Sequence, residues 1–274
     1  MDEEYKIRKW LYEKACTDIG LTLKVLDGEQ SLVRVSKRKD FFVTPFYDWP
    51  PLNTSVACDI AKDKVLTKEL LSKSGIKTPE GRHFFVANKN DWVPDHNLKE
   101  DAYLYAEGLG YPIVVKPHNL SRGQGVEVCY SREQLTKALE EIQKLSHVAM
   151  VEEVIVGREG RLFCIGDEIQ FMYYKESDAD TQVGNLAVGG KLVGFEDKKI
   201  PEKLSNLAKV VFDSFGHDLR LFAIDFFEQE SGDCILIEVN GKPFLSSICK
   251  YGYQDTALRV LVKSLEKYFK KSKI

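Results

Sequence analysis

The sequence predicts a fold of the α+β class. Its 274 residues amount to about two domains at roughly 150 residues each. Hydrophobic residues make up 43% of the chain and charged residues 30%, a balance that is typical of a folded protein and excludes a disordered chain. After residue 81, short apolar segments joined by tight turns alternate with amphipathic segments. This pattern favours helices packed on mixed sheets over a doubly wound parallel sheet.

The charge balance limits the partners that we expect. The chain has 39 basic and 42 acidic residues, a net charge of −3, and so lacks a general attraction for nucleic acid or an anionic membrane. Its apolar stretches are far shorter than the ~20 residues of a membrane helix. The first ten residues lack the apolar core of a signal peptide. We therefore expect a cytoplasmic protein that binds neither nucleic acid nor membranes.

Cysteine and histidine are dispersed along the chain. The six cysteines form no CxxC pair, and the five histidines are equally scattered. A structural zinc site needs ligands paired at short spacing, and a secreted disulfide framework is denser in cysteine. The sequence therefore predicts neither.

The first 57 residues are expected to form a short N-terminal α/β region ahead of a domain over 58–274. Apolar residues recur at helical spacing over 4–19, and Gly20 ends this helix. The stretch 45–51, PFYDWPP, predicts a linker or rigid turn. Three strands are expected between the helix and this linker, at 21–27, 31–36 and 41–46.

The domain over 58–274 is expected to start with helices and then to alternate. Asn53 or Thr54 can cap a first helix, and 62–74 predicts a second one that Gly75 ends. Strands are expected at 83–87, 112–117, 125–130, 148–155, 161–166, 168–174, 219–229 and 233–240. Helices are expected near 98–109, 131–145, 201–215 and 254–272, and a loop over 176–201.

Lys116 and the glycine-rich segment that follows it point to an anionic ligand. Lys116 ends an apolar strand, PIVVK, where a lysine is costly to bury unless an anion meets it. The next segment can present backbone N–H groups and one guanidinium to a phosphate chain. It is not a Walker loop, because GxxxxGK[ST] is absent, and a purely structural hairpin turn is the alternative. Its residues are Ser121, Arg122, Gly123, Gln124 and Gly125.

Three oxygen-bearing side chains should converge on the last hairpin. Asp225 and Glu238 flank a turn at Ser231-Gly232, which places them opposite each other on adjacent strands. Asn240 lies two residues after Glu238 and therefore on the same face. Two carboxylates and an amide are ligands that suit Mg²⁺. The alternative is a buried acid paired with lysine or arginine.

Glu152 and Glu153 end another apolar strand, just before a loop. Acids at such a place can accept hydrogen bonds from an adenine amino group and from ribose hydroxyls. A solvated strand end is the alternative for both residues.

Taken in order, these segments resemble the ATP-grasp family. The ATP-grasp domain of cyanophycin synthetases is similar to two of them, AKDKVLTKELLSKSGIKTPEGR and GYPIVVKPHNLSRGQGV. The segment VEEVIVGREGRLFCIGDEI resembles the hinge strand of the ATP-grasp family and the strand pair after it. The C-terminal half of glutathione-synthetase-like and ribosomal-protein-glutamate-ligase-like members is similar to NLAVGG and AIDFF…LIEVNGKP. The resemblance covers about residues 58–270. It implies an ATP-grasp fold, in which two α+β subdomains sandwich ATP.

The resemblance also implies a role for each motif. Lys64 and Lys116 match the lysines that hold the nucleotide phosphates, and the segment Ser121–Gly125 matches the flap over them. Glu152 matches the acceptor of the adenine amino group. Glu153 and Ile155 match the hinge backbone, and Glu159 matches the acid that binds the ribose. The ligands of two Mg²⁺ ions, for which Mn²⁺ is an alternative, match Asp225, Glu238 and Asn240.

The chain departs from the family pattern at three positions. Ala223 stands where D-alanine–D-alanine ligases carry an arginine, Val188 where ribosomal-protein-glutamate-ligase-like members carry one, and Phe244 where the family has the glycine of N-x-x-P-G. Arg161 matches a family arginine that faces the substrate end. The cations that could supply the missing charge are Arg161 and Arg220 near Ala223, and Lys175 and Lys191 near Val188.

The chemistry implied by the resemblance is ligation. ATP phosphorylates a carboxylate, and an amine then attacks the acyl phosphate and releases phosphate. We therefore expect an ATP-dependent carboxylate–amine ligase that acts on an amino acid or small peptide, and a homodimer by analogy. A phosphotransferase on the same scaffold and a non-catalytic ATP-binding subunit are the alternatives.

Overall fold

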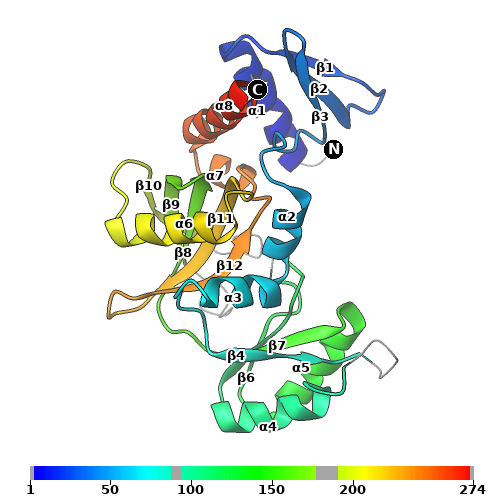
Figure 1. Cartoon of the computed structure of the whole chain (residues 1–274), viewed down its shortest axis with the longest axis vertical. Helices are drawn as coiled ribbons and strands as arrows, with labels where there is room; N and C mark the ends of the chain where they lie inside the picture. The colour runs from blue at the N-terminus through cyan, green and yellow to red at the C-terminus, as the bar shows by residue number, and fades with distance from the viewer. Residues whose placement is uncertain (1–2, 88–93, 122, 177–190, 272–274) are drawn as a thin grey trace.

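Three sheets follow one another along the long axis of the molecule (Figure 1). The computed structural model describes residues 3–87, 94–121, 123–176 and 191–271. Within these ranges every ladder between neighbouring strands is antiparallel, and helices cover the sheets. The α+β class that the sequence predicts is therefore confirmed. No helix of the described part has the length and apolarity that crossing a membrane requires.

The N-terminal unit consists of α1 (Glu3–Asp18) and a three-stranded sheet in the order β1-β2-β3. The helix and the three strands lie close to the segments that the sequence predicts. The strands are β1 (Thr22–Val25), β2 (Leu32–Lys37) and β3 (Asp40–Pro45). One face of this sheet packs on α1, and Val33 and Val35 of β2 are fully buried there.

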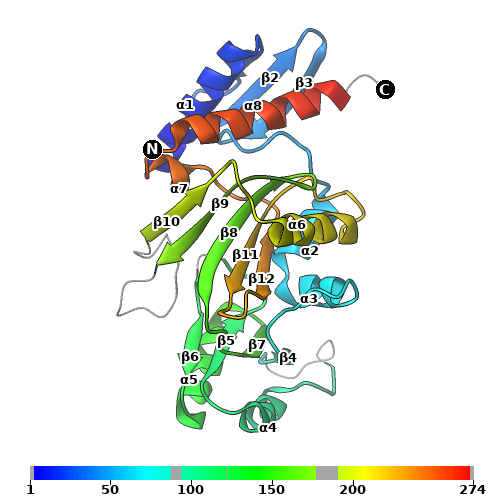
Figure 2. The same cartoon turned by 90° about the vertical axis from the view of Figure 1, so that its left-hand side faces the viewer.

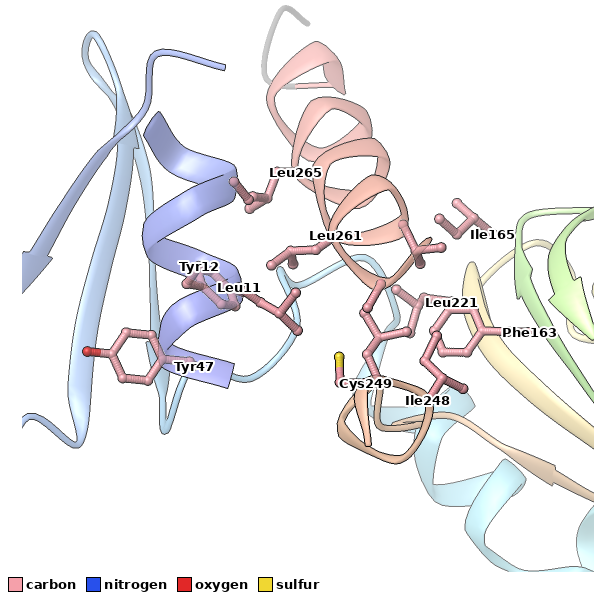
Figure 3. Close-up of a cluster of buried hydrophobic side chains, with 14 of the residues drawn as sticks. Leu11, Tyr12, Tyr47, Phe163, Ile165, Leu221, Ile248, Cys249, Leu261 and Leu265 are labelled. Atoms are coloured by element: carbon pink, nitrogen blue, oxygen red, sulfur yellow. The ribbon is translucent and has the colours of Figure 1, made fainter. Parts of the chain in front are cut away.

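The last helix, α8 (Gln254–Lys271), joins the N-terminal unit to the rest of the molecule. Figure 3 shows it between α1 and the central sheet. Leu11 of α1 and Leu261 of α8 belong to the same buried cluster as Phe163 and Leu221 of the central sheet. This shared core places the N-terminal unit at one end of the central sheet.

Two short helices lead from the N-terminal unit to the remainder of the chain. The first is α2 (Ser55–Lys62), which Thr54 caps, and the second is α3 (Lys64–Ser72). The Asp63 carboxylate accepts hydrogen bonds from two backbone N–H groups of α3, at 2.9 and 3.1 Å. The sequence places the start of this helix at Lys62, and the Asp63 cap is the reason that it starts two residues later.

The central sheet has five strands in the order β10-β9-β8-β11-β12. One face is covered by α6 (Glu202–Ser214) together with α2 and α3 (Figure 2). Alternation along β11 buries Ile224 and Phe226 in that core and so turns Asp225 towards the opposite face. The strands are β8 (Arg158–Ile165), β9 (Glu168–Glu176), β10 (Lys191–Glu196), β11 (Leu221–Glu228) and β12 (Cys234–Asn240).

Strand β10 corrects a prediction. The sequence predicts a loop over 176–201, but Lys191–Val193 pair with the end of β9. Leu192 packs into the core beside the N-terminal unit. The strand lies at the sheet edge and its register shifts after Val193, so too few residues alternate to reveal it in the sequence. The predicted loop residues 177–190 lie outside the described part of the chain.

The third sheet, here called the lower sheet, has the strand order β4-β7-β5-β6. Ile113 and Val115 of β5 pack under two helices, so Val114 and Lys116 face the other side. The strands are β4 (Gly81–Phe85), β5 (Ile113–Pro117), β6 (Glu127–Cys129) and β7 (Val148–Glu153). The helices are α4 (Lys99–Leu109) and α5 (Arg132–Leu145).

Asn53 ties the start of β11 to the chain that leaves β12. Its Oδ1 accepts hydrogen bonds from the backbone N–H groups of Arg220 (2.7 Å) and Leu221 (2.8 Å). Its Nδ2 donates to the carbonyl oxygens of Leu221 (2.7 Å) and Gly241 (2.8 Å). The β11–β12 ladder ends at Asn240, so this side chain continues the connection between the two strands. The short helix α7 (Ser246–Cys249) follows.

Replacing this amide should destabilise the protein. We expect Asn53→Ala to lower the free energy of unfolding by about 2–3 kcal/mol, because backbone donors and acceptors lose their partner. Asn53→Asp keeps the acceptor and should cost less. Denaturant unfolding followed by circular dichroism measures both. An Asn53→Ala variant that unfolds at the same denaturant concentration as wild type would contradict this stabilising role of Asn53.

Candidate functional site

A cavity of about 670 Å³ lies between the central and the lower sheet, within the range of small-molecule sites. Its apolar lining residues are Pro79, Pro112, Val114, Val126, Val128, Val154, Ile155, Val156, Phe227 and Ile237. Its ionisable lining residues are Lys64, Lys116, Glu152, Glu153, Arg158, Glu159, Arg161, Lys175, Glu176, Asp225 and Glu238. Such a lining suits a ligand with an apolar part and a charged part.

Glu152 and Lys116 form an ion pair on the inner face of the lower sheet. The Lys116 Nζ lies 2.6 Å from Glu152 Oε2, and the two side chains are only 7% and 4% exposed. The Nζ of Lys68, on α3, lies 3.0 Å from the other carboxylate oxygen. Burial alone would raise the pKa of Glu152, but the two ammonium groups outweigh burial and hold that pKa below its ordinary value.

Lys64 reaches the cavity from the first turn of α3. Its Nζ donates to the Leu120 carbonyl oxygen at 2.6 Å and lies 3.4 Å from Glu238 Oε2. Its backbone N–H donates to the carbonyl oxygen of His118 at 2.9 Å. Lys64 therefore links the segment before the glycines to β12, on the central sheet.

The glycine-rich segment Ser121–Gly125 borders the cavity through Gly123. Gly123 and Gly125 have φ of +72° and +71°, a region that favours glycine. A Cβ on Gly125 would also lie 2.9 Å from the Pro117 ring. Ser121 and Gln124 are exposed, and Arg122 lies outside the described residues. The turn over 123–126, closed by a hydrogen bond from the Val126 N–H to the Gly123 carbonyl oxygen at 3.2 Å, thus brings backbone close to the cavity.

The residues that follow β7 line another side of the cavity. Glu153 and Ile155, the two residues that match the hinge backbone of the family, both lie there. The Glu153 backbone N–H donates to the Glu80 carbonyl oxygen at 2.9 Å, and its carboxylate accepts from the Glu80 N–H at 2.7 Å. These bonds fix the point at which the chain leaves the lower sheet for the central one.

Asp225, Arg161 and Lys175 form a buried charge cluster on the inner face of the central sheet. The Arg161 Nε and Nη2 donate to the two Asp225 oxygens at 2.7 and 2.5 Å, and Lys175 Nζ donates to Asp225 Oδ1 at 3.0 Å. Burial would raise the pKa of Asp225, but Arg161 and Lys175 outweigh it and hold that pKa well below its ordinary value. Asp225 is therefore ionised and already has two cationic partners.

The predicted convergence of Asp225 and Glu238 is confirmed by the ladder, in which the two residues are direct partners. The alternative interpretation, an acid paired with arginine and lysine, also describes Asp225. In the described structure Asn240 is not among the residues that line the cavity. Its Oδ1 accepts a hydrogen bond from the Lys242 backbone N–H at 2.9 Å. Within the described ranges no group of three or more His, Cys, Asp or Glu residues could hold a metal ion.

Glu159 and Arg220 occupy different surroundings. Glu159 lines the cavity, and its carboxylate accepts a hydrogen bond from Lys175 Nζ. Burial raises the pKa of Glu159; Lys175 opposes this rise and Asp225 adds to it, so the pKa is above its ordinary value. Arg220 lies away from the cavity, where its Nε donates to the His217 carbonyl oxygen at 2.9 Å. The structure therefore brings Arg161 and Lys175 to Asp225, but not Arg220.

Comparison with known proteins identifies the family. The family described as D-ala D-ala ligase C-terminus matches residues 70–257, more than half of the chain. The chain belongs to this family. The D-alanine–D-alanine ligase of Bacillus licheniformis is 30% identical over 207 residues, which cover 70% of this chain and 54% of that protein. The alpha-aminoadipate–LysW ligase LysX of Sulfurisphaera tokodaii is 29% identical over 225 residues, which cover 80% and 71%.

Solved structures share the fold. The VanG D-Ala:D-Ser ligase from Enterococcus faecalis superposes with a TM-score of 0.60 at 18% identity, over 79% of this chain and 64% of that chain. The Bacillus anthracis D-alanine–D-alanine ligase complexed with ATP superposes with a TM-score of 0.56 at 18% identity, over 80% of this chain and 71% of that chain. The fold is therefore the ATP-grasp fold. In sequence, the match spans about half the length of the Bacillus licheniformis D-alanine–D-alanine ligase, 54%.

Sequence reasoning misses Lys68, Arg158 and Glu176. Lys68 follows Lys64 by four residues, so the two share a face of α3, and this spacing is the signal that could have revealed it. The Arg158 guanidinium stacks over the Tyr174 ring at 3.6 Å, a contact between strands that no short motif reports.

The Asp225 cluster should contribute strongly to stability. We expect Asp225→Asn to lower the free energy of unfolding by about 3–5 kcal/mol, because Arg161 and Lys175 lose a buried counter-ion. Glu238→Gln is the matched control. The Glu238 side chain is 25% exposed and lies 3.4 Å from the Lys64 Nζ, so this substitution should lower the free energy of unfolding by at most about 1 kcal/mol. Equal costs in denaturant unfolding would contradict the assignment.

The same cluster predicts a dependence on pH. Because the pKa of Asp225 is depressed in the folded protein, its stabilisation is complete above about pH 4, the ordinary pKa of aspartate, and is lost as the pH falls below it. Melting temperatures between pH 7 and pH 3 measure this loss. In the Asp225→Asn variant the melting temperature should fall less between pH 7 and pH 3. The same fall as in wild type would count against the role of Asp225 in the acid dependence.

Proposed function

We propose that this chain is an ATP-dependent carboxylate–amine ligase that forms an amide or peptide bond through an acyl phosphate. The observation that carries the proposal is the convergence of Lys64, Lys116, Asp225 and Glu238 on one cavity between the two sheets. Membership of the D-ala D-ala ligase C-terminus family supports it. The likeness of the motifs to cyanophycin synthetases and to ribosomal-protein-glutamate ligases stays a prediction.

The nucleotide would occupy the cavity with its base beside the apolar lining and its phosphates beside the lysines. Val154, Ile155 and Phe227 offer apolar surface for a planar base. Glu152 would accept the adenine amino group. Glu153 and Ile155 would supply the hinge, and Glu159 would bind the ribose. Lys64, Lys116 and the segment Ser121–Gly125 would hold the phosphates.

The carboxylates on the central-sheet side of the cavity have the chemistry of a magnesium site. Asp225 and Glu238 are ladder partners that offer hard oxygen donors, and Asn240 lies on the same strand as Glu238. We expect these three residues to hold two Mg²⁺ ions, with Mn²⁺ as an alternative. Bound metal would offset the negative charge of the phosphates. Asp225 would share its oxygens between that site and its two cations, so Glu238 is the more available ligand.

Arg161 and Lys175 would act on the reacting groups. A carboxylate is a poor electrophile, so its oxygen first takes the terminal phosphoryl group of ATP and ADP leaves. The amine then attacks the carbonyl carbon, which forms the C–N bond and a tetrahedral intermediate. This intermediate loses the amine proton and re-forms its carbonyl group, which breaks the bond to the phosphate oxygen and releases phosphate. Arg161 and Lys175 lie where their positive charges would stabilise the transferring phosphoryl group and the oxyanion. No nucleophile from the protein is required.

The substrates would be an amino acid or small peptide and an amine. The names of the relatives describe the joining of D-alanine to D-alanine and of alpha-aminoadipate to LysW. Ala223 and Phe244 differ from the family pattern near the substrate end, which supports a substrate of its own for this chain. The homodimer stays a prediction that light scattering tests.

The first experiment measures phosphate release from Mg-ATP against a matrix of amino acids and dipeptides, with mass spectrometry of each active reaction. A product lighter by one water than its two substrates establishes ligation and names them. A product heavier by one phosphate group would contradict ligation and indicate a phosphotransferase.

The metal assignment predicts a loss of turnover without loss of the fold. Glu238→Gln should abolish Mg-ATP turnover, because an amide cannot replace the anionic ligand, while circular dichroism and melting temperature stay near wild type. Full activity in this variant would refute the role of Glu238.

Lys116 should contribute to ATP affinity. Lys116→Ala removes one cation from the phosphate site, so we expect ATP binding to weaken by about 10-fold or more. Isothermal titration calorimetry measures the change. An unchanged affinity would mean that Lys116 serves only as the counter-ion of Glu152.

A further inference from the structure

Glu152 is paired with two lysines that come from different parts of the molecule. Lys116 belongs to β5 beside it and contacts one carboxylate oxygen, whereas Lys68 belongs to α3 and contacts the other. Lys68 also donates to the Pro79 carbonyl oxygen. Of the two lysines, Lys116 lines the cavity and Lys68 does not, within the described structure. Only Lys116 is therefore placed to meet a ligand.

This division matters when a nucleotide binds. The proposed function assigns Lys116 to the phosphates, so a bound nucleotide draws its ammonium group away from Glu152. A carboxylate that is 4% exposed takes up a proton if it loses all its cations. Within the described residues Lys68 does not line the cavity, and its ammonium group is also held by the Pro79 carbonyl oxygen, so the nucleotide does not draw it away from Glu152. Glu152 therefore keeps a counter-ion in the complex.

Gly81 directs the Glu152 side chain from the neighbouring strand. The two residues are partners in the β4–β7 ladder. A Cβ on Gly81 would lie 2.5 Å from Glu152 Cγ and 2.6 Å from the Val151 carbonyl oxygen. The side chain of Glu152 thus crosses β4 where there is no side chain to oppose it. Gly81 and Lys68 together fix the position of the carboxylate.

The charge on Glu152 decides which base it can bind. An ionised carboxylate only accepts hydrogen bonds, whereas a protonated one can also donate. Adenine presents an amino group, a donor, at carbon 6, and hypoxanthine presents a carbonyl oxygen, an acceptor, at the same place. We infer that Lys68 is a positioning residue that makes the site selective for adenine by keeping Glu152 an ionised acceptor. This inference rests on the proposed function, because it takes ATP as the ligand.

The test compares ATP with inosine triphosphate, which has a carbonyl oxygen in place of the amino group and an N–H at nitrogen 1, and keeps the ribose and phosphates. Dissociation constants are measured by calorimetry in the presence of Mg²⁺. A hydrogen bond between a charged acceptor and the amino group predicts that wild type prefers ATP by about 10- to 100-fold. In Lys68→Met the preference should fall to about 3-fold or less, mainly through weaker ATP binding.

Two further substitutions separate charge from packing. Lys68→Arg keeps the positive charge and should retain the wild-type preference. Lys68→Gln keeps a donor for Pro79 without the charge and should lose the preference, and it replaces Lys68→Met if that variant does not fold. In a Lys68→Met/Glu152→Gln double variant the preference should be no lower than in Glu152→Gln alone, because Lys68 acts through Glu152.

The outcomes distinguish the two proposals. Absence of ATP binding to wild type would overturn both the proposed function and the role of Lys68. ATP binding with an unchanged preference in folded Lys68→Met or Lys68→Gln would overturn the role of Lys68 alone. Additive losses in the double variant would also overturn it, because they would mean that Lys68 acts independently of Glu152.

Discussion

Buried ion pairs between carboxylates and lysine or arginine dominate the region between the central and the lower sheet. The two buried carboxylates there, Glu152 and Asp225, each contact two cations. An ionised carboxylate without such partners would be costly to bury, so these pairs decide how the cations are oriented. A phosphate chain that enters the cavity offers the same cations another anion. Some of the ion pairs that stabilise the fold are therefore ones that a bound phosphate chain would rearrange.

Helix α3 connects the parts of the site. It packs against β12 and α6, on the central side of the cavity. Its cations reach the other side as well: Lys64 contacts both Glu238 of β12 and the segment before the glycines, and Lys68 contacts Glu152 on the lower sheet. Asp63 caps the helix and its carboxylate lies 3.6 Å from His118 Nε2. A shift of the lower sheet relative to the central sheet would have to change these contacts.

The N-terminal unit holds the segment that follows Asn240. The Phe244 ring, which stands where the family has a glycine, lies under the Arg8 guanidinium of α1 at 4.0 Å. The Trp49 indole donates to the Pro243 carbonyl oxygen at 2.6 Å. This segment is thus held by residues from the first 57 positions. The bulky ring is accommodated by packing against the N-terminal unit, which gives that unit a structural reason to accompany the ATP-grasp fold.

The sequence by itself determined the local and near-local features: the α+β class, the hairpin that opposes Asp225 to Glu238, the buried strand that ends at Lys116, and the glycine turn after it. Periodicity and turn residues carry this information within one or two neighbouring elements. Only the tertiary structure decided the partners of the buried charges. Lys68 and Glu152 are 84 positions apart, Arg161 and Asp225 are 64, and Lys175 and Asp225 are 50. Those contacts depend on the order of strands in each sheet and on where α3 docks, and no local pattern of residues encodes either.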